Sequence, residues 1–213
     1  DIQIQFEVKE DMLWSKLFQA GELIQYSYLE DTLALWDGQT IFSTRPVSVE
    51  APSAAFPFNW QKLLLLKKKG VKVFPLTHAT GISSTGNPRL DATLPWPERY
   101  WLPEETAQGI RQAKKEKKRV IALGTSVVRA LESAVNRKTH EVMAGSRFTA
   151  LKISPHFSRH IVDGLLTGMH ETGSSHLQML QSFVPNGLLN QAYQEAVEQE
   201  YLWHEYGDTC LIL

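Results

Sequence analysis

The feature that most constrains the fold is the alternation of short apolar runs with amphipathic stretches after residue 45. The run "RVIALG" (119–124) is mostly apolar, and "TSVVRALESAVNR" (125–137) directly after it has the spacing of a helix. An apolar run of this length that ends in a glycine predicts a buried strand. Strands that alternate with helices predict an α/β domain built on a mixed, largely parallel sheet.

Local signals delimit further elements of this domain. Asn59 as a cap and Gly70 as a stop predict a helix over 59–70. Pro103 and the two glutamates after it predict a helix over 103–118, because acidic residues favour the positive end of the helix dipole. Two further helices are predicted over 175–183 and 188–203, and strands over 71–79, 148–154, 160–168 and 209–213.

Residues 1–44 have a different pattern. "IQIQFEV" (2–8) alternates apolar and polar residues, and "LIQYSYL" (23–29) and "TLALWDGQTIF" (32–42) continue the habit, with Asp37-Gly38 as a hairpin turn. We therefore expect residues 1–44 to form a separate small barrel or part of an inserted domain, and residues 45–213 to form the α/β domain.

The composition narrows the class of protein. A chain of 213 residues with 43% hydrophobic content can bury a sizeable core. No apolar run is long enough for a membrane span, and no signal peptide is visible. The single cysteine, Cys210, excludes an intramolecular disulfide and suits a reducing compartment. We expect a cytoplasmic monomer without membrane association.

The net charge of −1 hides an uneven distribution. Residues 60–120 carry 13 Lys plus Arg against 5 Asp plus Glu, and the rest of the chain carries 9 against 18. A basic segment in a neutral protein can bind phosphate. The alternative is that "KKK" (67–69) and "KKEKKR" (114–119) are solvated helix ends, where cations favour the dipole.

The junction at residue 124 is the clearest binding motif. Gly124 allows close approach of a ligand, and the backbone N–H groups of a helix that begins at Thr125 or Ser126 suit an anion. The alternative is that one of these hydroxyls only caps the helix. Arg129 and Glu132 fall one turn apart, so they can also pair with each other.

Several polar clusters follow predicted strands. His78 ends the strand over 71–79, and ligands of open α/β sheets bind outside such ends. "HETGSSH" (170–176) contains two histidines six residues apart, whereas a zinc protease helix needs four. Its serines can cap the helix that follows, and His170 with Glu171 can form an acid–base pair. Near the end of the chain lies a further cluster, comprising His204, Glu205 and Asp208.

Six collinear stretches between residues 44 and 213 resemble the S-adenosylmethionine:tRNA ribosyltransferase-isomerase family. They are "TRPVSVEAPSAAFPF", "GVKVFPLTHATG", "PERYWLPEETAQGI", "RVIALGTSVVRALES", "VDGLLTGMHETGSSHLQML" and "AYQEAVEQEYLWHEYGDTCLIL". The resemblance implies an enzyme that moves the ribosyl part of S-adenosylmethionine to a 7-aminomethyl-7-deazaguanine base at the wobble position of tRNA. Adenine and methionine leave, and no metal is required. It also implies an α/β fold with an inserted antiparallel β-barrel.

The resemblance implies roles for individual residues. A base must remove an acidic proton beside the sulfonium, and an acid must help adenine to leave. The residues expected to do this work are His170, Glu205, Asp208 and His78. The residues expected to bind substrate are Gly124, Thr125, Ser126, Arg129, Glu98, Tyr100, Ser174, Ser175, His176, Tyr206 and Gly207.

The chain also departs from the family pattern. "HATGISS" (78–84) keeps the histidine of the family's "HVGAGTF" but not its glycine spacing, and "GMHETGSS" (168–175) lacks the lysine of "NFHLPKST". These departures indicate a divergent branch. Two alternatives therefore stay open: an enzyme acting on a small nucleoside or another base, and a catalytically silent tRNA-binding protein.

Overall fold

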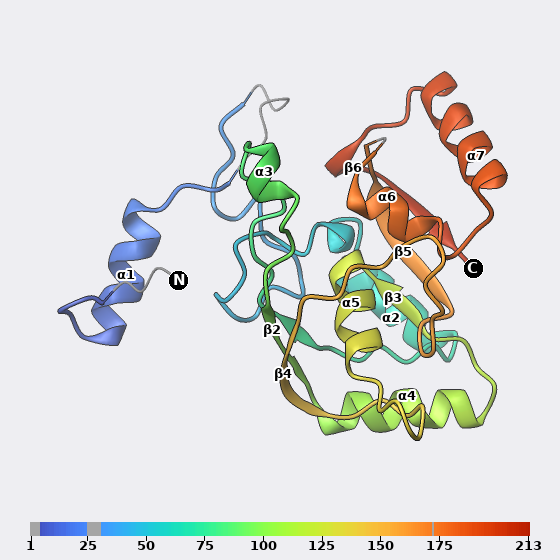
Figure 1. Ribbon diagram of the computed structural model, residues 1–213. Helices are drawn as coiled ribbons and strands as arrows, with labels where there is room; N and C mark the ends of the chain where they lie inside the picture. Colours follow the sequence, from blue (N-terminus) through green and yellow to red (C-terminus); the bar gives the residue numbers. More distant parts are fainter. Residues whose placement is uncertain (1–4, 25–30, 172) are drawn as a thin grey trace. The chain divides into compact units, whose positions relative to one another are not determined.

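The computed structural model describes residues 5–24, 31–171 and 173–213, without the side chains of residues 204 and 205. The chain divides into two units, Asp1–Gly38 and Gln39–Leu213. Figure 1 shows the elements of both. The division falls six residues before the domain boundary expected from the sequence, and the assignment of residues 1–44 to a β-barrel stays a prediction.

The described part of the first unit contains a helix where the sequence indicated only strands. Helix α1 spans Glu10–Ala20, with Glu10 and Asp11 in its first turn. Acidic residues at that end favour a helix, and this signal was missed. The turn expected at Asp37-Gly38 is present, but residues 5–8 and 31–44 are not in strands, and residues 25–30 of the second predicted strand lie outside the description.

The second unit contains two small sheets. The first has the order β1-β2-β4, formed by Thr77–His78, Glu98–Leu102 and Gly145–Thr149. Both pairings are antiparallel. Strand β2 was not predicted, because its alternate residues are charged or aromatic and two prolines precede it. Those alternate residues are the buried ones, Glu98, Tyr100 and Leu102.

The second sheet has the order β3-β5-β6, formed by Ile121–Leu123, Gly164–Met169 and His204–Ile212. Strands β3 and β5 are parallel, whereas β5 and β6 are antiparallel. The prediction of a largely parallel sheet is therefore wrong for the described strands, although the mixed α/β class is confirmed. Two helices separate β5 from β6 in the sequence. The first residue of β6, His204, then pairs with the last residue of β5, Met169.

Each predicted helix of the second unit overlaps an observed one, whereas the short helical segments at 53–55 and 88–91 were not predicted. The side chain of Asn59 accepts a hydrogen bond from Lys62 N and so caps α2, as predicted. No described helix is long and apolar enough to cross a membrane. The helical segments are η1 (Ser53–Ala55), α2 (Trp60–Lys68), α3 (Pro88–Asp91), α4 (Glu104–Lys115), α5 (Thr125–Ser133), α6 (Ser175–Leu180) and α7 (Asn186–Glu198).

Helix α5 lies between the two sheets and contacts strands of both (Figure 1). Its residues Val128, Ala130 and Leu131 are buried and belong to one core cluster with Leu165 of β5 and Leu180 of α6. Because these contacts fix α5 against both sheets, they also fix where the helix begins. That beginning, directly after β3, is the junction that the sequence marked as a binding motif.

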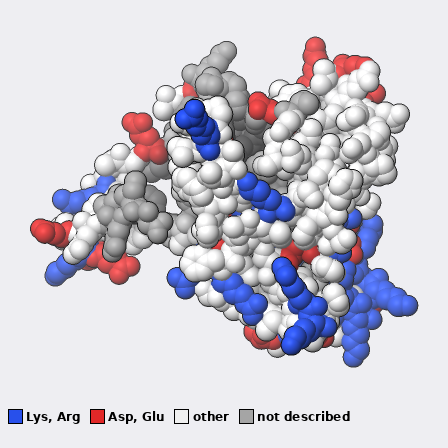
Figure 2. Space-filling view, in the orientation of Figure 1, with Lys and Arg blue, Asp and Glu red and all other residues white. Residues whose placement is uncertain are grey.

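The basic residues gather at the C-terminal ends of α2 and α4. The carboxyl pKa of Glu116, just after α4, is lowered by hydrogen bonds from Lys118 and Gln112 and by the charges of Lys118 and Lys72. Figure 2 shows blue side chains over the end of α4, at the lower right. We call this set the basic surface: Lys67, Lys68, Lys69, Lys72, Lys115, Lys117, Lys118 and Arg119.

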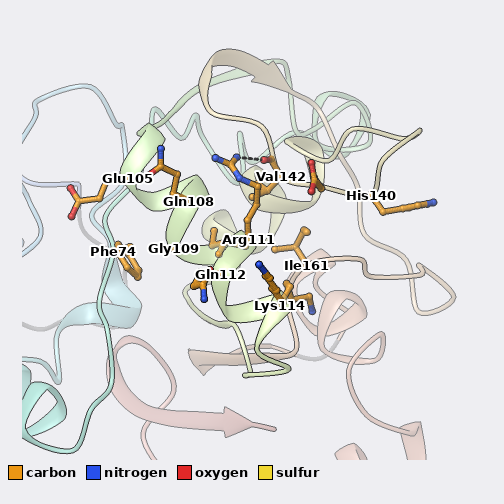
Figure 3. Close-up of a pocket in the computed structure, with 13 residues that line it drawn as sticks. Phe74, Glu105, Gln108, Gly109, Arg111, Gln112, Lys114, His140, Val142 and Ile161 are labelled. Atoms are coloured by element: carbon orange, nitrogen blue, oxygen red, sulfur yellow. Dashed lines mark hydrogen bonds between the residues drawn. The ribbon is translucent and has the colours of Figure 1, made fainter.

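Two helix glycines give a test of packing around α4. A Cβ added at Gly109 would lie 2.5 Å from the ring of Phe74 (Figure 3), whereas one added at Gly187 in α7 would meet nothing within 4 Å. Gly→Ala in a helix normally stabilises, because alanine has the higher helix propensity. We expect Gly187→Ala to raise the free energy of unfolding by about 0.5 kcal/mol and Gly109→Ala to lower it by about 1–3 kcal/mol. Urea unfolding checks both, and equal gains would contradict the packing of Phe74.

Candidate active site

The buried carboxylate of Glu98 contacts two other residues predicted for the site, His78 and Arg129. Glu98 Oε2 lies 3.0 Å from His78 Nε2 and 2.7 Å from Arg129 Nη1. Its other oxygen accepts a hydrogen bond of 2.8 Å from Gly81 N. His78 Nδ1 lies 2.9 Å from the carbonyl oxygen of Ser126. These contacts connect β1, β2 and the first turn of α5, and Glu98 is only 9% exposed.

Burial raises the pKa of the Glu98 carboxyl, but hydrogen bonds from His78 and Gly81 and the charge of Arg129 outweigh it and hold the pKa below its ordinary value. Folding therefore favours the ionised form. This contribution to stability is complete above the ordinary carboxyl pKa and is lost as the pH falls through the lower folded value.

Arg129 is held from a second side as well, because its Nε donates to the carbonyl of Leu151 at 3.0 Å. Among the described residues its Nη2 is buried and has no hydrogen-bond partner. A buried unpaired donor costs about 1–3 kcal/mol, and such groups call for an explanation such as a functional role.

The start of α5 is shaped by Gly124. Its φ of 98° lies in the left-handed region that favours glycine, and an added Cβ would approach Ala54 of η1 at 3.5 Å. Gly124 itself is the cap residue, and no side chain caps the helix. The alternative that Thr125 or Ser126 only caps the helix is therefore wrong. Both residues are half-buried.

His170 and His176 meet just beyond the end of β5. Their rings stack with centroids 4.9 Å apart and an interplanar angle of 23°. His170 Nε2 lies 2.8 Å from the hydroxyl of Thr167, and His170 N donates to the hydroxyl of Tyr193 at 3.2 Å. Contacts from β5 and α7 therefore position His170, and the first turn of α6 places His176 against it.

The His176 imidazole is electrostatically linked to the Glu98 cluster. Burial lowers its pKa; the charges of Glu50 and Glu98 oppose this, and that of Arg129 adds to it, with a net lowering. Glu50 is itself held by Ser83, whose N–H donates to its carboxylate at 3.0 Å. Groups of the two predicted clusters, around His78 and around His170, therefore act on one another electrostatically, and their joint role as one site stays a prediction.

Arg129 and Glu132 do not pair with each other. Glu132 is 6% exposed, and its carboxylate accepts three backbone N–H bonds, from His160 at 2.9 Å, Ile161 at 3.0 Å and Val162 at 2.9 Å. The side chain fixes the loop that enters β5. The alternative of a local ion pair is wrong because each partner finds several hydrogen bonds elsewhere in the fold.

Residues of the cluster near the C-terminus have structural contacts. The ring of Tyr206 stacks against Phe56 at 4.7 Å. A Cβ at Gly207 would lie 2.3 Å from the carbonyl oxygen of Leu202, so the close approach requires glycine. Asp208 is exposed, and its carboxylate accepts a hydrogen bond of 2.9 Å from Leu202 N. The side chain of Glu205 lies outside the described part.

The remaining predicted residues fall into two groups. Tyr100 is 1% exposed and packs edge-on against His78 with ring centroids 6.3 Å apart, so it supports that histidine from within the core. Ser174 caps α6 by accepting from Leu177 N at 3.1 Å, and Ser175 is exposed at the first position of that helix.

A cavity of about 760 Å³ lies along α4. Figure 3 shows Arg111 in its wall, bonded to the carbonyl oxygen of Val142, with His140 at one side. None of the residues predicted for the site lines it. Among the described residues, no group of three or more His, Cys, Asp or Glu could hold a metal ion.

The sequence reasoning missed Glu50, Thr167 and Tyr193. Thr167 is a polar residue inside an apolar strand, which was a usable signal. Tyr193 and Glu50 carried none, because their contacts depend on how α7 and the segment before η1 pack against distant strands.

Comparison with known proteins identifies close sequence relatives. The family described as queuosine biosynthesis protein matches residues 1–212. The S-adenosylmethionine:tRNA ribosyltransferase-isomerase of Thermus thermophilus is 35% identical over 205 residues, which are 94% of this chain and 59% of that protein. The protein of the same name from Thermotoga maritima is 30% identical over 99% of this chain and 62% of its own length.

A solved structure has the same fold. The crystal structure of S-adenosylmethionine tRNA ribosyltransferase from Thermotoga maritima matches with a TM-score of 0.61 and 30% identity, over 75% of this chain and 51% of that one. The chain spans about three fifths of the length of the curated relatives it matches.

The buried carboxylate provides a test of the site's geometry. Glu98→Gln removes the charge that Arg129 and His78 face, so we expect the free energy of unfolding at pH 7 to fall by about 3 kcal/mol. The difference from the wild type should shrink as the pH falls through the lowered folded pKa of Glu98 and the carboxyl becomes protonated. Urea unfolding at several pH values checks this.

The matched control is Glu104→Gln, which changes an exposed carboxylate paired with Arg111. It should leave the free energy of unfolding nearly unchanged, because exposed pairs contribute little. Equal effects of the two substitutions would show that Glu98 does not organise the site.

Proposed function

Because the chain belongs to the queuosine biosynthesis protein family, we propose that it moves the ribosyl group of S-adenosylmethionine to a 7-aminomethyl-7-deazaguanine base in tRNA. The observation that carries this proposal is the family match over residues 1–212. S-adenosylmethionine is a substrate here, and the reaction belongs to the transferases and isomerases of queuosine biosynthesis.

The charges of the site support a cationic substrate. Two carboxylates, Glu50 and Glu98, and one guanidinium, Arg129, interact electrostatically with the imidazole of His176. A field in which carboxylates outnumber cations favours the positive sulfonium of S-adenosylmethionine. Glu98 is neutralised by its ion pair with Arg129, which leaves Glu50 as the carboxylate for the sulfonium.

The start of α5 supports binding of the substrate's anionic group. Backbone N–H groups in the first turn of a helix bind carboxylates and phosphates, and Gly124 lets a ligand approach them closely. Thr125 and Ser126 add two half-buried hydroxyls that do not cap the helix. We assign the methionine carboxylate to this position.

His170 is the residue we assign to proton transfer. It is half-buried, and contacts from two elements position it, as general acid–base residues require. His78 and Tyr100 are buried, and we assign them to positioning of α5 rather than to contact with substrate. The roles of Glu205 and Asp208 stay predictions.

The basic surface supports a tRNA partner. Its side chains at the ends of α2 and α4 are exposed. Lysine and arginine clusters of this kind bind the phosphate backbone without base specificity. A cytoplasmic location and a monomeric state stay predictions.

Binding and turnover test the proposed reaction. Calorimetric titration with S-adenosylmethionine should show tighter binding when tRNA carrying the deazaguanine base is present, and adenine should be released. His170→Asn should slow adenine release by about 10²–10⁴-fold, because general acid–base catalysis contributes that much. His156→Asn, which changes an exposed histidine, is the matched control.

Each other outcome has a meaning. Adenine release with the free base alone indicates a small-molecule acceptor. Binding of tRNA without release of adenine indicates a catalytically silent binder. Absence of S-adenosylmethionine binding both with and without the modified tRNA contradicts the proposal.

Salt dependence tests the tRNA surface. Lys117→Gln, Lys118→Gln and Arg119→Gln together should weaken tRNA binding and flatten the plot of log affinity against log salt, by roughly 0.7–0.9 for each lost phosphate contact. The control removes the same charge elsewhere, at Arg137, Lys138 and Lys152. Filter binding at several salt concentrations measures both, and equal slopes would exclude this surface.

A further inference from the structure

The two stacked imidazoles of His170 and His176 are the feature that the proposed function leaves unexplained. His170 follows the last residue of β5, and His176 lies in the first turn of α6. Five residues separate them in the sequence, yet the fold brings their rings to 4.9 Å, nearly parallel. Both are half-buried.

Two imidazoles at this distance cannot easily both be charged. Two like charges in partly buried surroundings repel, so protonation of one ring disfavours protonation of the other. Such pairs titrate as a unit, with apparent pKa values that belong to the pair. The stack therefore favours a single proton over two.

The surroundings differ between the two rings. Burial disfavours the charged form of His176 and lowers its pKa, and the positive charge of Arg129 lowers the pKa further. The negative charges of Glu50 and Glu98 raise the pKa, but they do not offset the lowering. His170 instead has the hydroxyl of Thr167 at 2.8 Å from Nε2, and a hydroxyl can accept a hydrogen bond from the protonated ring. The surroundings therefore disfavour a proton on His176, whereas a protonated His170 would have the Thr167 hydroxyl as an acceptor.

We propose that His170 and His176 act as one acid–base unit, in which a single proton resides on His170 and His176 is the proton acceptor. This inference rests on the proposed function, which needs both an acid and a base. Environments that separate the proton affinities of neighbouring groups are how sites assign these two roles.

The unit balances the two proton transfers of the reaction. His176 takes the proton from the carbon beside the sulfonium, and the electron pair of that bond stays on the carbon next to the positive sulfur. His170 gives its proton to adenine as the bond between adenine and ribose breaks. The electron pair of that bond leaves with adenine, and a lone pair of the ring oxygen supplies the ribose carbon. The unit keeps its total charge, with the proton moved from one ring to the other.

A second histidine pair in the same chain provides a matched control. The rings of His140 and His160 lie 5.1 Å apart with an interplanar angle of 36°. His160 precedes β5 and His170 follows it, so the two pairs lie at opposite ends of that strand. Substitution of His160 removes a similar ring contact without touching the site.

The kinetic test uses His176→Asn, with His160→Asn as the control. The His176 variant should slow adenine release at least tenfold while the Kd for S-adenosylmethionine changes less than about threefold. The wild-type pH–rate profile should be bell-shaped, and the variant should lose its acidic limb, because that limb reports protonation of the acceptor. A His176 variant with normal release, or with an unchanged profile, overturns the inference.

Histidine ring NMR titration tests the shared proton without any turnover. In His170→Asn the apparent pKa of His176 should rise, and in His176→Asn that of His170 should rise, because each substitution removes a like charge. His160→Asn should change neither. Independent titration of the two rings overturns the inference.

The two proposals fail in distinguishable ways. A wild-type chain that binds S-adenosylmethionine and modified tRNA but releases no adenine overturns the proposed function. It also overturns the acid–base role, whatever the ring titrations show. Adenine release that depends on His170 but not on His176 overturns only the acid–base unit.

Discussion

The buried carboxylate of Glu98 is the interaction on which the site depends. It gathers the imidazole of His78, the guanidinium of Arg129 and the N–H of Gly81, and so connects β1, β2 and α5. An ionised carboxylate is costly to bury unless it is paired and hydrogen-bonded. These donors come from different elements. Because an unpaired Glu98 would destabilise the fold, the need to pair it holds those elements in one arrangement.

This arrangement also fixes the surroundings of the candidate site. Helix α5 contacts both sheets, so its first turn and Gly124 have one defined position. On the other side of the site, the antiparallel return of β6 and the helix pair α6 and α7 place Tyr193 and His176 around His170. Charged groups of the first sheet and imidazoles beside the second thus act on one another, as the response of His176 to Glu98 and Arg129 indicates.

Much of the helical structure could be predicted from the sequence. Helices α2, α4 and α5 lie within the predicted ranges, because caps, dipole charges and 3.6-residue periodicity are local signals. Strand β2 was missed, since its buried face carries Glu98 and Tyr100 rather than aliphatic residues. Helix α1 was missed as well, and it buries none of its residues, so no core-facing stripe marked it.

The sequence by itself determined the family, the positions of α2, α4 and α5, and that polar residues follow the strands at His78, Gly124 and His170. Only the tertiary structure decided the partners. Arg129 binds Glu98, 31 positions away, rather than Glu132 one turn along, and His176 stacks on His170. The physical reason is that a buried charge or ring takes the partners that satisfy it most completely, and packing of distant elements, which no local pattern records, supplies them.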